Sequence, residues 1–318
     1  MDQFIDFKII KSLALETGFQ DCAAVNAKEF DISFLLEWIN KGYNAEMQYL
    51  LNNLDKRKNP SLLLDNGKSI ISFIVSYNTQ EFADMKLNNG SESNNNLKFA
   101  AYSHFEDYHK VIKQALYKII ACIQEDYPDF KAIAFVDSSP FSEKMIAKEA
   151  GLGFIGKNSL LINKKYGSQI LLGEIITNYS TDYNTEFIED LCKDCSLCIE
   201  ACPNKAINND KTLNANLCSS YQNMINKGEI EESIRLDGYI YGCDICLKAC
   251  PFNNKPKVLN SKILGLNTSM QELIIGINNN YIDKSLFNKA KKKGAIENIK
   301  FQKLLSNIEK AKQEITRK

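Results

Sequence analysis

The sequence predicts a mixed α/β or α+β protein that carries an inserted cysteine-rich module and ends in a short helical segment. Strand and helix patterns alternate between residues 69 and 177, which argues for an α/β layer. Eight of the ten cysteines fall within residues 192–250. After Pro251 the apolar spacing becomes helical again. We therefore expect three parts: residues 1–180, residues 181–255 and residues 256–318.

The composition is that of an ordinary globular protein, since 44% of the 318 residues are hydrophobic and 25% are charged. No apolar run reaches the roughly 18 residues that a membrane-spanning helix needs. The N-terminus, "MDQFIDFKII", lacks the basic start and apolar stretch of a secretory signal, and it lacks a twin-arginine pair. We expect a cytoplasmic protein without a membrane contact.

The N-terminal part is expected to open with helices and a buried strand. Apolar residues at three- and four-residue spacing predict helices at 4–16 and 32–54. "SIISFIVSYN" predicts a buried strand at 69–78, and an amphipathic pattern predicts a helix at 106–126. That helix is expected to end before Pro128, which cannot continue it.

A strand, a helix and two further strand patterns follow. "KAIAFVD" (131–137) predicts a strand that stops at Asp137, and a helix is expected over roughly 141–150. "GLGFIGKNSLLI" (151–162) predicts a glycine turn that enters a strand, and "SQILLGEIIT" (168–177) predicts a second strand. Two isolated cysteines in apolar surroundings are expected to be small core residues, Cys22 and Cys122.

Asp137 is a candidate catalytic residue because of its place in the pattern. It ends a strand beside a glycine-rich turn, which is where α/β folds usually place chemistry. Such an aspartate could act as a general acid if burial raises its pKa. An aspartate that caps the following helix is the alternative, and the pattern alone does not separate the two.

Two further stretches suggest ligand contacts. The three glycines of "GLGFIGKN" allow a ligand to approach the backbone closely, but strands rather than a helix follow, so a dinucleotide fingerprint is not indicated. In "DKRKNP" (55–60), Arg57 could bind a phosphate or amide oxygen in a bidentate manner. A solvated surface charge run is the alternative for that stretch.

The cysteine-rich part contains two runs that end alike, "CIEACP" at 198–203 and "CLKACP" at 246–251. They match bacterial ferredoxins, in which three cysteines and a distant fourth bind each [4Fe–4S] cluster. Tight gaps let one loop wrap three corners of a cube, while the next cysteine reaches the other cluster. This cross-over predicts one cluster on Cys192, Cys195, Cys198 and Cys250, and another on Cys243, Cys246, Cys202 and one more cysteine. The second run is one cysteine short, and Cys218 is the available substitute.

A structural zinc site is the alternative for these cysteines. It would want four cysteines in two pairs, and the chain has only two histidines, His104 and His109. Disulfides are not expected in a reducing cytoplasm. A ferredoxin module moves single electrons, and a carrier alone needs neither the about 180 residues before it nor the about 65 after it. The rest of the chain is therefore expected to hold the electron acceptor.

The charge is balanced over the chain but not along it. Lys+Arg and Asp+Glu both number 39, whereas the segment from Lys284 to Lys318 holds eleven basic and three acidic residues. A basic end on a neutral protein suggests contact with a polyanion. A solvated lysine-rich helix is the alternative.

Taken in order, several stretches resemble the epoxyqueuosine reductase family over about residues 1–300. They include "GYNAEMQYL", "KRKNP", "DYHKV", Asp137 with the "SSPFSEKMIAKEAGLGFIGKNSLLI" that follows it, "LLGEIIT", the first cysteine run and "GYIYGCDICLKACPFN". The resemblance implies a cobalamin-binding catalytic domain like that of reductive dehalogenases, with cobalamin beside the proximal cluster. It implies reduction of an epoxide on a modified guanosine, epoxyqueuosine, at the wobble position of tRNA. That reaction gives an alkene and water, and it consumes two electrons and two protons.

The resemblance also implies roles for individual residues. It makes Asp137 the proton donor to the departing epoxide oxygen. It implies cobalamin contacts from Arg57, Tyr102, Asp137, Lys157, Asn158, Ser220, Cys243 and Asp244. It implies tRNA contacts from the basic segment, here Lys289, Lys291, Lys292 and Lys293. The chain departs from the family pattern after "CSSY", where Asn223 and Ile225 replace the usual Thr and Glu.

The expected partners follow from the same resemblance. They are a tRNA with a GUN anticodon that carries epoxyqueuosine and an external electron donor of the ferredoxin or flavodoxin type; we expect a monomer. A reductive dehalogenase is one alternative, although those proteins generally carry the twin-arginine signal that is missing here. A plain electron-transfer subunit is another, and it would hold eight irons but no corrinoid.

Overall fold

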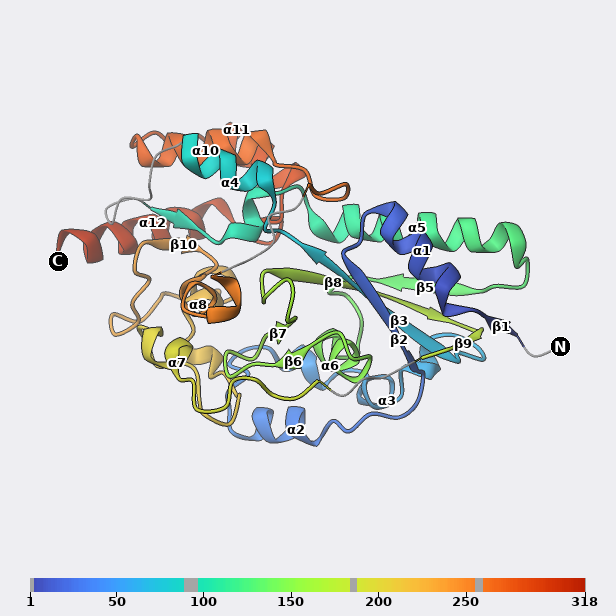
Figure 1. The fold of residues 1–318 in the computed structure, drawn as a ribbon. Helices are drawn as coiled ribbons and strands as arrows, with labels where there is room; N and C mark the ends of the chain where they lie inside the picture. The colour runs from blue at the N-terminus through green and yellow to red at the C-terminus, as the bar shows by residue number, and fades with distance from the viewer. Residues whose placement is uncertain (1–2, 89–96, 184–187, 255–259, 318) are drawn as a thin grey trace.

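A four-stranded sheet runs through the N-terminal half of the chain, with helices on both of its faces (Figure 1). The computed structural model describes residues 3–88, 97–183, 188–254 and 260–317. The strand order is β2-β3-β8-β5, and all three pairings are antiparallel. The sheet is therefore of the α+β type, because β8 enters between β3 and β5 and runs against both. The strands span Asp21–Asn26 (β2), Ser69–Ser76 (β3), Ala132–Phe135 (β5) and Ile170–Thr177 (β8).

The two faces of the sheet are covered by different helices. Helices α1 (Phe7–Thr17) and α5 (Tyr108–Asp126) pack on one face, and α6 (Glu143–Glu149) packs on the other. Side chains alternate along β8, so Gly173 lies against α5, where a Cβ would stand 2.8 Å from Ile112. The next residue, Glu174, consequently points toward the face that α6 covers.

Most of the expected elements of this part are present. The strands expected at 69–78 and 168–177 are β3 and β8, and the helix expected at 106–126 is α5. A short strand, β1 (Phe4–Ile5), precedes α1 and pairs with β9 (Ser180–Thr181).

The two isolated cysteines differ in their exposure to solvent. Cys22 is buried in β2, as expected, whereas Cys122 is exposed. The prediction for Cys122 is wrong because the residue lies on the outer surface of α5, whose buried residues include Ile119 and Ile123.

The single helix expected at 32–54 is also wrong. The segment folds as α2 (Ser33–Asn40), the 3₁₀ turn η1 (Gln48–Leu51) and the start of α3 (Leu54–Lys58). Three left-handed residues interrupt it, Gly42 (φ 68°), Ala45 (φ 50°) and Asn53 (φ 55°), and a right-handed helix cannot pass through such positions.

The glycine-rich stretch forms a small hairpin of β6 (Phe154–Ile155) and β7 (Leu161–Ile162). Gly153 is required at its start, because a Cβ there would stand 2.4 Å from the carbonyl oxygen of Ile162. The hairpin projects Lys157 and Asn158 from its turn.

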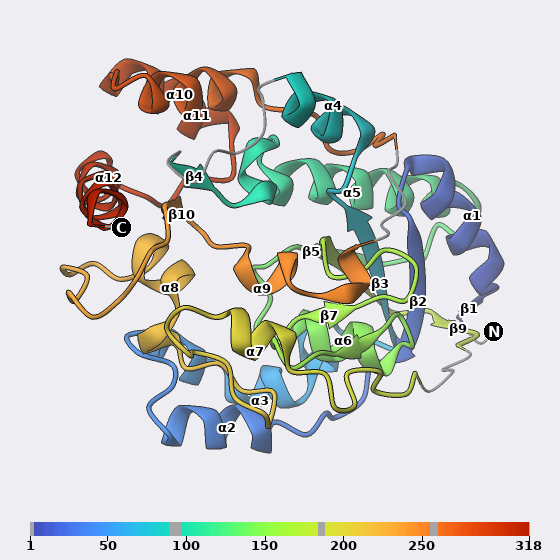
Figure 2. The same ribbon diagram turned by 60° about the vertical axis from the view of Figure 1, so that its left-hand side comes forward.

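The cysteine-rich part is built from short pieces that Figure 2 shows between the sheet and α12. The repeat halves contain α7 (Leu197–Ala201) and α9 (Ile245–Lys248), which pack together. The other pieces are η4 (Ala215–Leu217), α8 (Ser219–Met224), β10 (Tyr239–Tyr241) and η5 (Pro251–Asn253). Strand β10 pairs in parallel with β4 (Lys98–Phe99) from the N-terminal part.

Three helices close the chain: α10 (Thr268–Asn278), α11 (Lys284–Lys293) and α12 (Phe301–Thr316). Their apolar residues share one core with β4 and β10, so Leu273 and Leu304 belong to the same cluster as Phe99, Ile240 and Tyr241. The three-part division stays a prediction, and its second boundary lies outside the described residues. Within the described ranges, no helix has the length and apolar character needed to cross a bilayer.

The remaining described elements are short. They are η2 (Pro60–Leu63), α4 (Gln80–Asn88) and η3 (Ala101–His104). The last of these leads directly into α5 and brings Tyr102 close to Tyr108, with ring centroids 6.1 Å apart.

Candidate redox site

The first predicted cluster group surrounds a single cavity. The four thiols of Cys192, Cys195, Cys198 and Cys250 line a space of about 180 Å³, together with Lys157 and Asn158 of the β6–β7 turn. A tight turn, with the amide of Cys195 donating to the carbonyl of Cys192 at 2.7 Å, begins the wrapping loop. The structure thus brings together the four cysteines that the cross-over pattern groups, although they are up to 58 residues apart in sequence.

The second predicted group lies next to the first. Burial, with smaller contributions from Cys218, Asp244 and Cys202, raises the pKa of the Cys243 thiol to about 12. Burial likewise raises the pKa of Cys246, with contributions from Cys243, Cys218 and Cys198. Without a metal these thiols would hold their protons, and a bound iron would displace them. No three His, Cys, Asp or Glu side chains in the described part converge as ligands of one metal ion.

Asn158 gives a direct test of whether the first cavity suits a cluster. Its side chain is 3% exposed, and its Oδ1 accepts a hydrogen bond from the amide of Leu160 at 3.3 Å. Its Nδ2 is buried without a hydrogen-bond partner among the described residues, although it lines the cavity of the four thiols. Buried amide donors normally have an acceptor. A cluster sulfur would supply one, so the residues present fit a cluster.

Asp137 lies at the end of β5 in a network of proton donors. Its Oδ2 accepts a hydrogen bond from the Tyr108 hydroxyl at 3.1 Å and lies 3.4 Å from His109 Nε2. The other imidazole nitrogen of His109 lies 2.8 Å from Oδ1 of Asp107, which is 3% exposed. The Asp137 side chain itself is 63% exposed, so the expected condition of burial is not met.

The two side chains that contact Asp137, Tyr108 and His109, both have raised pKa values. Burial, followed by the charge of Asp137, raises the pKa of Tyr108. Burial opposes a charge on His109, but its hydrogen bonds to Asp137 and Asp107 outweigh that effect and raise the pKa of the imidazole. Both side chains can therefore donate to the Asp137 carboxylate near neutral pH.

Two glutamates close to Asp137 were not singled out from the sequence. Glu174 is fully buried on β8, and Ser72 of β3 donates to its Oε1 at 3.1 Å. Glu143, the first residue of α6, accepts a hydrogen bond from the backbone amide of Asp137. The signal available in the sequence was a lone carboxylate inside the otherwise apolar strand "ILLGEIIT".

The other predicted cofactor residues form two groups. Arg57 donates to the carbonyl of Pro140, close to Asp137. The hydroxyls of Tyr102 and Ser220 both meet the Met224 thioether, at 3.5 and 3.4 Å. Asp244, beside Cys243, accepts from the Ala101 amide at 2.6 Å. Lys157 and Asn158 instead line the first thiol cavity, where the Lys157 amide hydrogen-bonds Cys192.

The loop that carries Cys243 and Asp244 is held by a buried amide. Asn223 Nδ2 donates to the carbonyls of Tyr239 and Gly242 at 3.1 and 2.9 Å, and its Oδ1 accepts from the Gly242 amide at 2.8 Å. Asn307 of α12 in turn donates to the Asn223 carbonyl at 2.8 Å.

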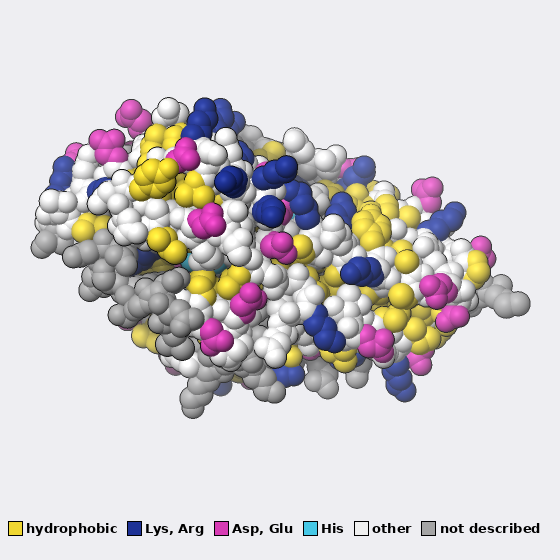
Figure 3. Space-filling view, turned by 90° about the horizontal axis from the view of Figure 1, so that it is seen from above, with side chains coloured by type: hydrophobic (Ala, Val, Ile, Leu, Met, Phe, Trp, Pro, Cys, Tyr) yellow, Lys and Arg dark blue, Asp and Glu magenta, His cyan; other side chains and the backbone are white. Residues whose placement is uncertain are grey.

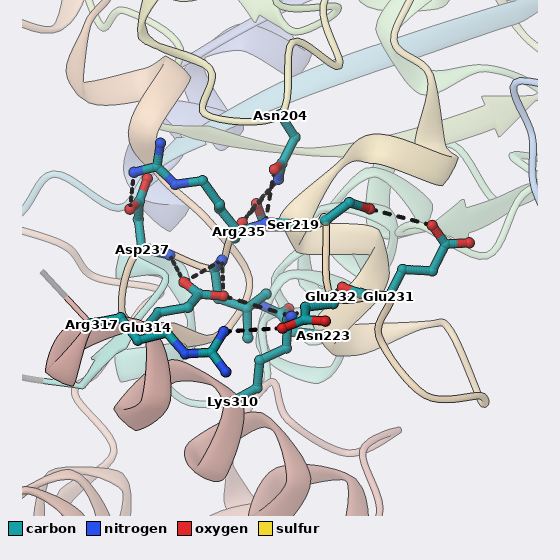
Figure 4. Close-up of polar contacts among 12 residues, drawn as sticks. Asn204, Ser219, Asn223, Glu231, Glu232, Arg235, Asp237, Lys310, Glu314 and Arg317 are labelled. Atoms are coloured by element: carbon teal, nitrogen blue, oxygen red, sulfur yellow. Dashed lines mark hydrogen bonds and ion pairs between the residues drawn. The ribbon is translucent and has the colours of Figure 1, made fainter.

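A second link joins α12 to the cysteine-rich part. Figure 4 shows Glu314 facing Asp237. The Glu314 carboxylate accepts hydrogen bonds from the backbone amides of Leu236 and Asp237 at 2.9–3.0 Å. Arg317, one turn further along, pairs with Glu232 at 3.1 Å. The C-terminal helix therefore supports the cysteine-bearing loops from outside.

The predicted basic segment ends beside the Asp137 network. The carbonyl of Lys293, the last residue of α11, accepts from the amide of Asp107 at 2.9 Å. Lys289, Lys292 and Lys293 are exposed, whereas Lys291 donates to the Ile299 carbonyl at 2.9 Å. Lys and Arg side chains gather on this side of the molecule, toward the middle of the face in Figure 3.

Eight thiols in two adjoining groups are the ligands that two iron–sulfur clusters need, and the Asp137 network adds side chains that can donate protons. Together these are the features of an iron–sulfur oxidoreductase. Residues 191–253 match the family model "4Fe-4S double cluster binding domain", and residues 57–138 match "Epoxyqueuosine reductase QueG, DUF1730". The chain is 33% identical to the epoxyqueuosine reductase of Cyclobacterium marinum over 96% of its own length and 97% of that protein. It belongs to the epoxyqueuosine reductase family.

Solved structures agree with this membership. The structure of epoxyqueuosine reductase from Streptococcus thermophilus is 28% identical and superposes with a TM-score of 0.77, covering 95% of this chain and 79% of that one. An epoxyqueuosine reductase solved with an epoxyqueuosine-modified tRNA-Tyr stem loop shares the fold, with a TM-score of 0.80 at 24% identity and coverage of 97% and 81%.

Proposed function

We propose that this chain reduces epoxyqueuosine to queuosine at the wobble position of tRNA. The observation that carries the proposal is an Asp137 carboxylate held by two proton donors, in a member of this family and beside a double-cluster domain. The overall reaction adds two electrons and two protons to the epoxide and releases the oxygen as water, leaving an alkene. A tRNA substrate would place the reaction in the cytoplasm, with an external donor of the ferredoxin or flavodoxin type.

The residues expected to hold the cofactors suit that role. Two [4Fe–4S] clusters would be bound by the two cysteine groups, and cobalamin by Arg57, Tyr102, Asp137, Lys157, Asn158, Ser220, Cys243 and Asp244. When bound, the clusters and the cobalamin would supply the two electrons. Within the described residues the Ser220 hydroxyl meets a thioether, which is a weak acceptor. An amide carbonyl of a corrinoid would be a better partner, so this hydroxyl fits such a group.

Asp137 would deliver a proton to the departing oxygen. An alkoxide is a poor leaving group at neutral pH, so protonation at the moment of bond cleavage lowers the barrier. After the transfer, the Asp137 carboxylate would recover a proton from His109, whose Nε2 lies 3.4 Å from its Oδ2, while the Tyr108 hydroxyl donates a hydrogen bond to the same oxygen. The exposure of Asp137 leaves its other face available to a substrate.

The exposed lysines of α11 would contact the phosphates of the anticodon arm. Phosphate contacts hold the nucleic acid in register without reading its sequence. Because α11 ends next to Asp107, these contacts would lie near the carboxylate that acts on the base. A modified base would then be turned out of the loop toward Asp137, as in other enzymes that act on a base.

Asp137→Asn tests the proposal. The variant keeps the size and a hydrogen-bond acceptor but cannot donate an acidic proton, so turnover should fall by about 10²–10⁴-fold. Iron and corrinoid content after anaerobic reconstitution should match the wild type. Turnover is measured by nucleoside analysis of treated tRNA.

Asp126→Asn, at the far end of α5 and exposed, is the matched control and should be fully active. Wild-type turnover in Asp137→Asn would remove Asp137 from the reaction. A protein that binds eight irons, takes up no corrinoid and leaves the epoxide intact would instead be an electron carrier.

A further inference from the structure

We propose that Glu143, together with Glu174, is a positioning residue that holds the backbone of Asp137 in the conformation presenting its carboxyl group to the site. The proposal rests on the proposed function only for the role of Asp137 in turnover. The hold itself is a property of the fold, and it can be measured without substrate.

The backbone at Asp137 needs such a hold. Its φ of 53° places a non-glycine residue in the left-handed region, which L-residues disfavour. Residues in this state persist when surrounding contacts fix them. The strand β5 ends at Phe135, so no sheet pairing fixes the Asp137 amide. That amide donates instead to Glu143 Oε1.

Glu143 is well placed to act as the acceptor. It is the first residue of α6, and α6 packs on β3 and β8, so its backbone is fixed relative to the sheet. Its side chain reaches the Asp137 amide, so this hydrogen bond joins the two ends of the loop at residues 136–142. Asp137 and Glu143 are six residues apart, so the contact is local in the sequence.

Glu174 lies close to Glu143 and influences whether the Glu143 carboxyl group is ionised. It is fully buried in the centre of the sheet, opposite Ser72 on one side and Phe135 on the other. Ser72 satisfies Oε1, whereas Oε2 is buried without a hydrogen-bond partner among the described residues. A fully buried carboxyl group that is incompletely paired is costly to ionise, so Glu174 is expected to be neutral.

The neighbouring carboxyl groups also favour the protonated state of Glu174 and Glu143. Burial raises the pKa of Glu174, and Glu143 raises it further, followed by Asp137. Burial and Asp137 raise the pKa of Glu143 to about 7, against the opposing effects of the Asp137 amide, a hydrogen bond with Glu174, and His109. Lys144 of α6 also faces the carboxyl groups of Asp137 and Glu143. From α5, Tyr108 and His109 also face Asp137. Below about pH 7, where the carboxyl groups of Glu143 and Glu174 hold their protons, Glu143 can stay close to Asp137 without strong repulsion.

The sign of the pH dependence follows. A carboxyl group whose pKa is raised in the closed loop favours that loop fully below its ordinary pKa and loses this contribution as the pH rises through the raised value. The hold should therefore weaken as the pH rises through about 7. Ionised Glu143 would face the carboxyl group of Asp137 and the buried Glu174, so the loop would open.

Amide hydrogen exchange of residues 136–142 tests the hold. Glu143→Ala removes the acceptor, so exchange in this segment should rise at least ten-fold and kcat should fall about ten- to a hundred-fold, with KM for tRNA and the iron content unchanged. Glu143→Gln keeps an acceptor oxygen and should restore protection. Glu149→Ala, in the last turn of the same helix, is the control and should leave exchange unchanged.

Unchanged exchange in folded Glu143→Ala would overturn the proposal. If Glu143→Ala does not fold, the pH profile of amide exchange in Glu143→Gln tests the proposal instead. After correction for intrinsic chemical exchange, wild-type protection should fall as the pH rises from the ordinary carboxyl value of 4.5 to about 7 and level off above it, while Glu143→Gln should show a flatter profile; equal profiles would also overturn it. If the wild type does not reduce epoxyqueuosine but these exchange results hold, the proposed function fails and the hold stands.

Discussion

Asp137 illustrates how much of a site depends on its immediate neighbours. Its place at the end of a strand could be predicted from "KAIAFVD", because a run of apolar residues that stops at a carboxylate is a local pattern. Its partners could not be predicted in this way. Tyr108 and His109 come from α5, Glu143 from α6 and Glu174 from β8, and only the packing of these elements brings them together.

The pH dependence of turnover should report on His109. Its hydrogen bonds to Asp137 and Asp107 raise the pKa of the imidazole, so it is charged below that value and can return a proton to Asp137. We expect kcat to fall as the pH rises through the raised pKa. His109→Gln should lower kcat about ten-fold at pH 6 and make the profile flatter.

This is measured as kcat between pH 6 and 9 with a saturating chemical reductant. His104→Gln is the control, because His104 contacts Gln271 and not Asp137. A wild-type profile in His109→Gln would show that the imidazole does not supply the proton.

Asn158 should influence the reduction potential of the first cluster. A hydrogen bond to sulfur stabilises the more negative, reduced state, so losing it lowers the potential. Asn158→Leu removes the buried donor at similar size, and we expect a fall on the order of tens of millivolts. The measurement is an EPR-monitored redox titration.

Asn216→Leu, an exposed amide in the same part of the chain, is the control. Normal potentials combined with weakened corrinoid binding in Asn158→Leu would favour the contact with cobalamin that the family resemblance implies. Thus the one experiment separates the two roles.

At the scale of elements, long periodic patterns were predictable and special backbone positions were not. Helix α5 and strands β3 and β8 were predictable because each contains many apolar residues in a pattern typical of its kind of element. The segment at 32–54 has a helical pattern too, but left-handed residues such as Ala45 break it. No local preference of alanine signals such a conformation, because tertiary contacts impose it. Strand β2 was not predicted, because its six residues are too few to show a clear period.

The contact of α12 with the Cys243 loop should contribute to stability. Asn307 is fully buried and donates to the carbonyls of Asn223 and Ile240 at 2.8 and 2.9 Å. Asn307→Leu leaves both carbonyls without this donor, which should cost about 1–3 kcal/mol and lower the melting temperature. Gln313→Leu, exposed on the same helix, should have little effect.

Differential scanning calorimetry of the reconstituted proteins measures this. The iron content of Asn307→Leu should also fall, because Asn223 holds Gly242 next to Cys243. If the variant melts like the wild type, the buried amides do not support the loop.

At the scale of the whole molecule, the grouping of the cysteines was predictable and the interlocking of the parts was not. The repeated "ACP" endings predict that each run gives its last cysteine to the other group, and Cys250 does line one cavity with Cys192, Cys195 and Cys198. The assignment of these cysteines to clusters stays a prediction. Nothing local in "YIY" or "LKFA" indicates that β10 pairs with β4 across 140 residues of chain. Such pairing depends on complementary surfaces, which a single sequence does not display.

The basic face should make tRNA binding depend on salt. Lys289 and Lys293 are exposed on α11, and each phosphate contact releases counterions. A Lys289→Ala/Lys293→Ala double variant should bind tRNA more weakly and lower the slope of log K against log salt by about 1–2. Fluorescence anisotropy between 50 and 200 mM salt would measure the slope.

A Lys8→Ala/Lys118→Ala double variant, with exposed lysines on α1 and α5, is the matched control and should keep the wild-type slope. If both double variants lose the same slope, binding is spread over the surface rather than located at α11. If neither does, the α11 lysines do not contact tRNA.

The shared core of β4, β10 and the last three helices has a consequence for biosynthesis. The loop bearing Cys243 rests on Asn307, which leaves the ribosome after every cysteine has been made. The clusters should therefore become stable only after α12 has been made. Ribosome-stalled nascent chains that end before Phe301 should acquire no stable clusters, whereas released chains should acquire both.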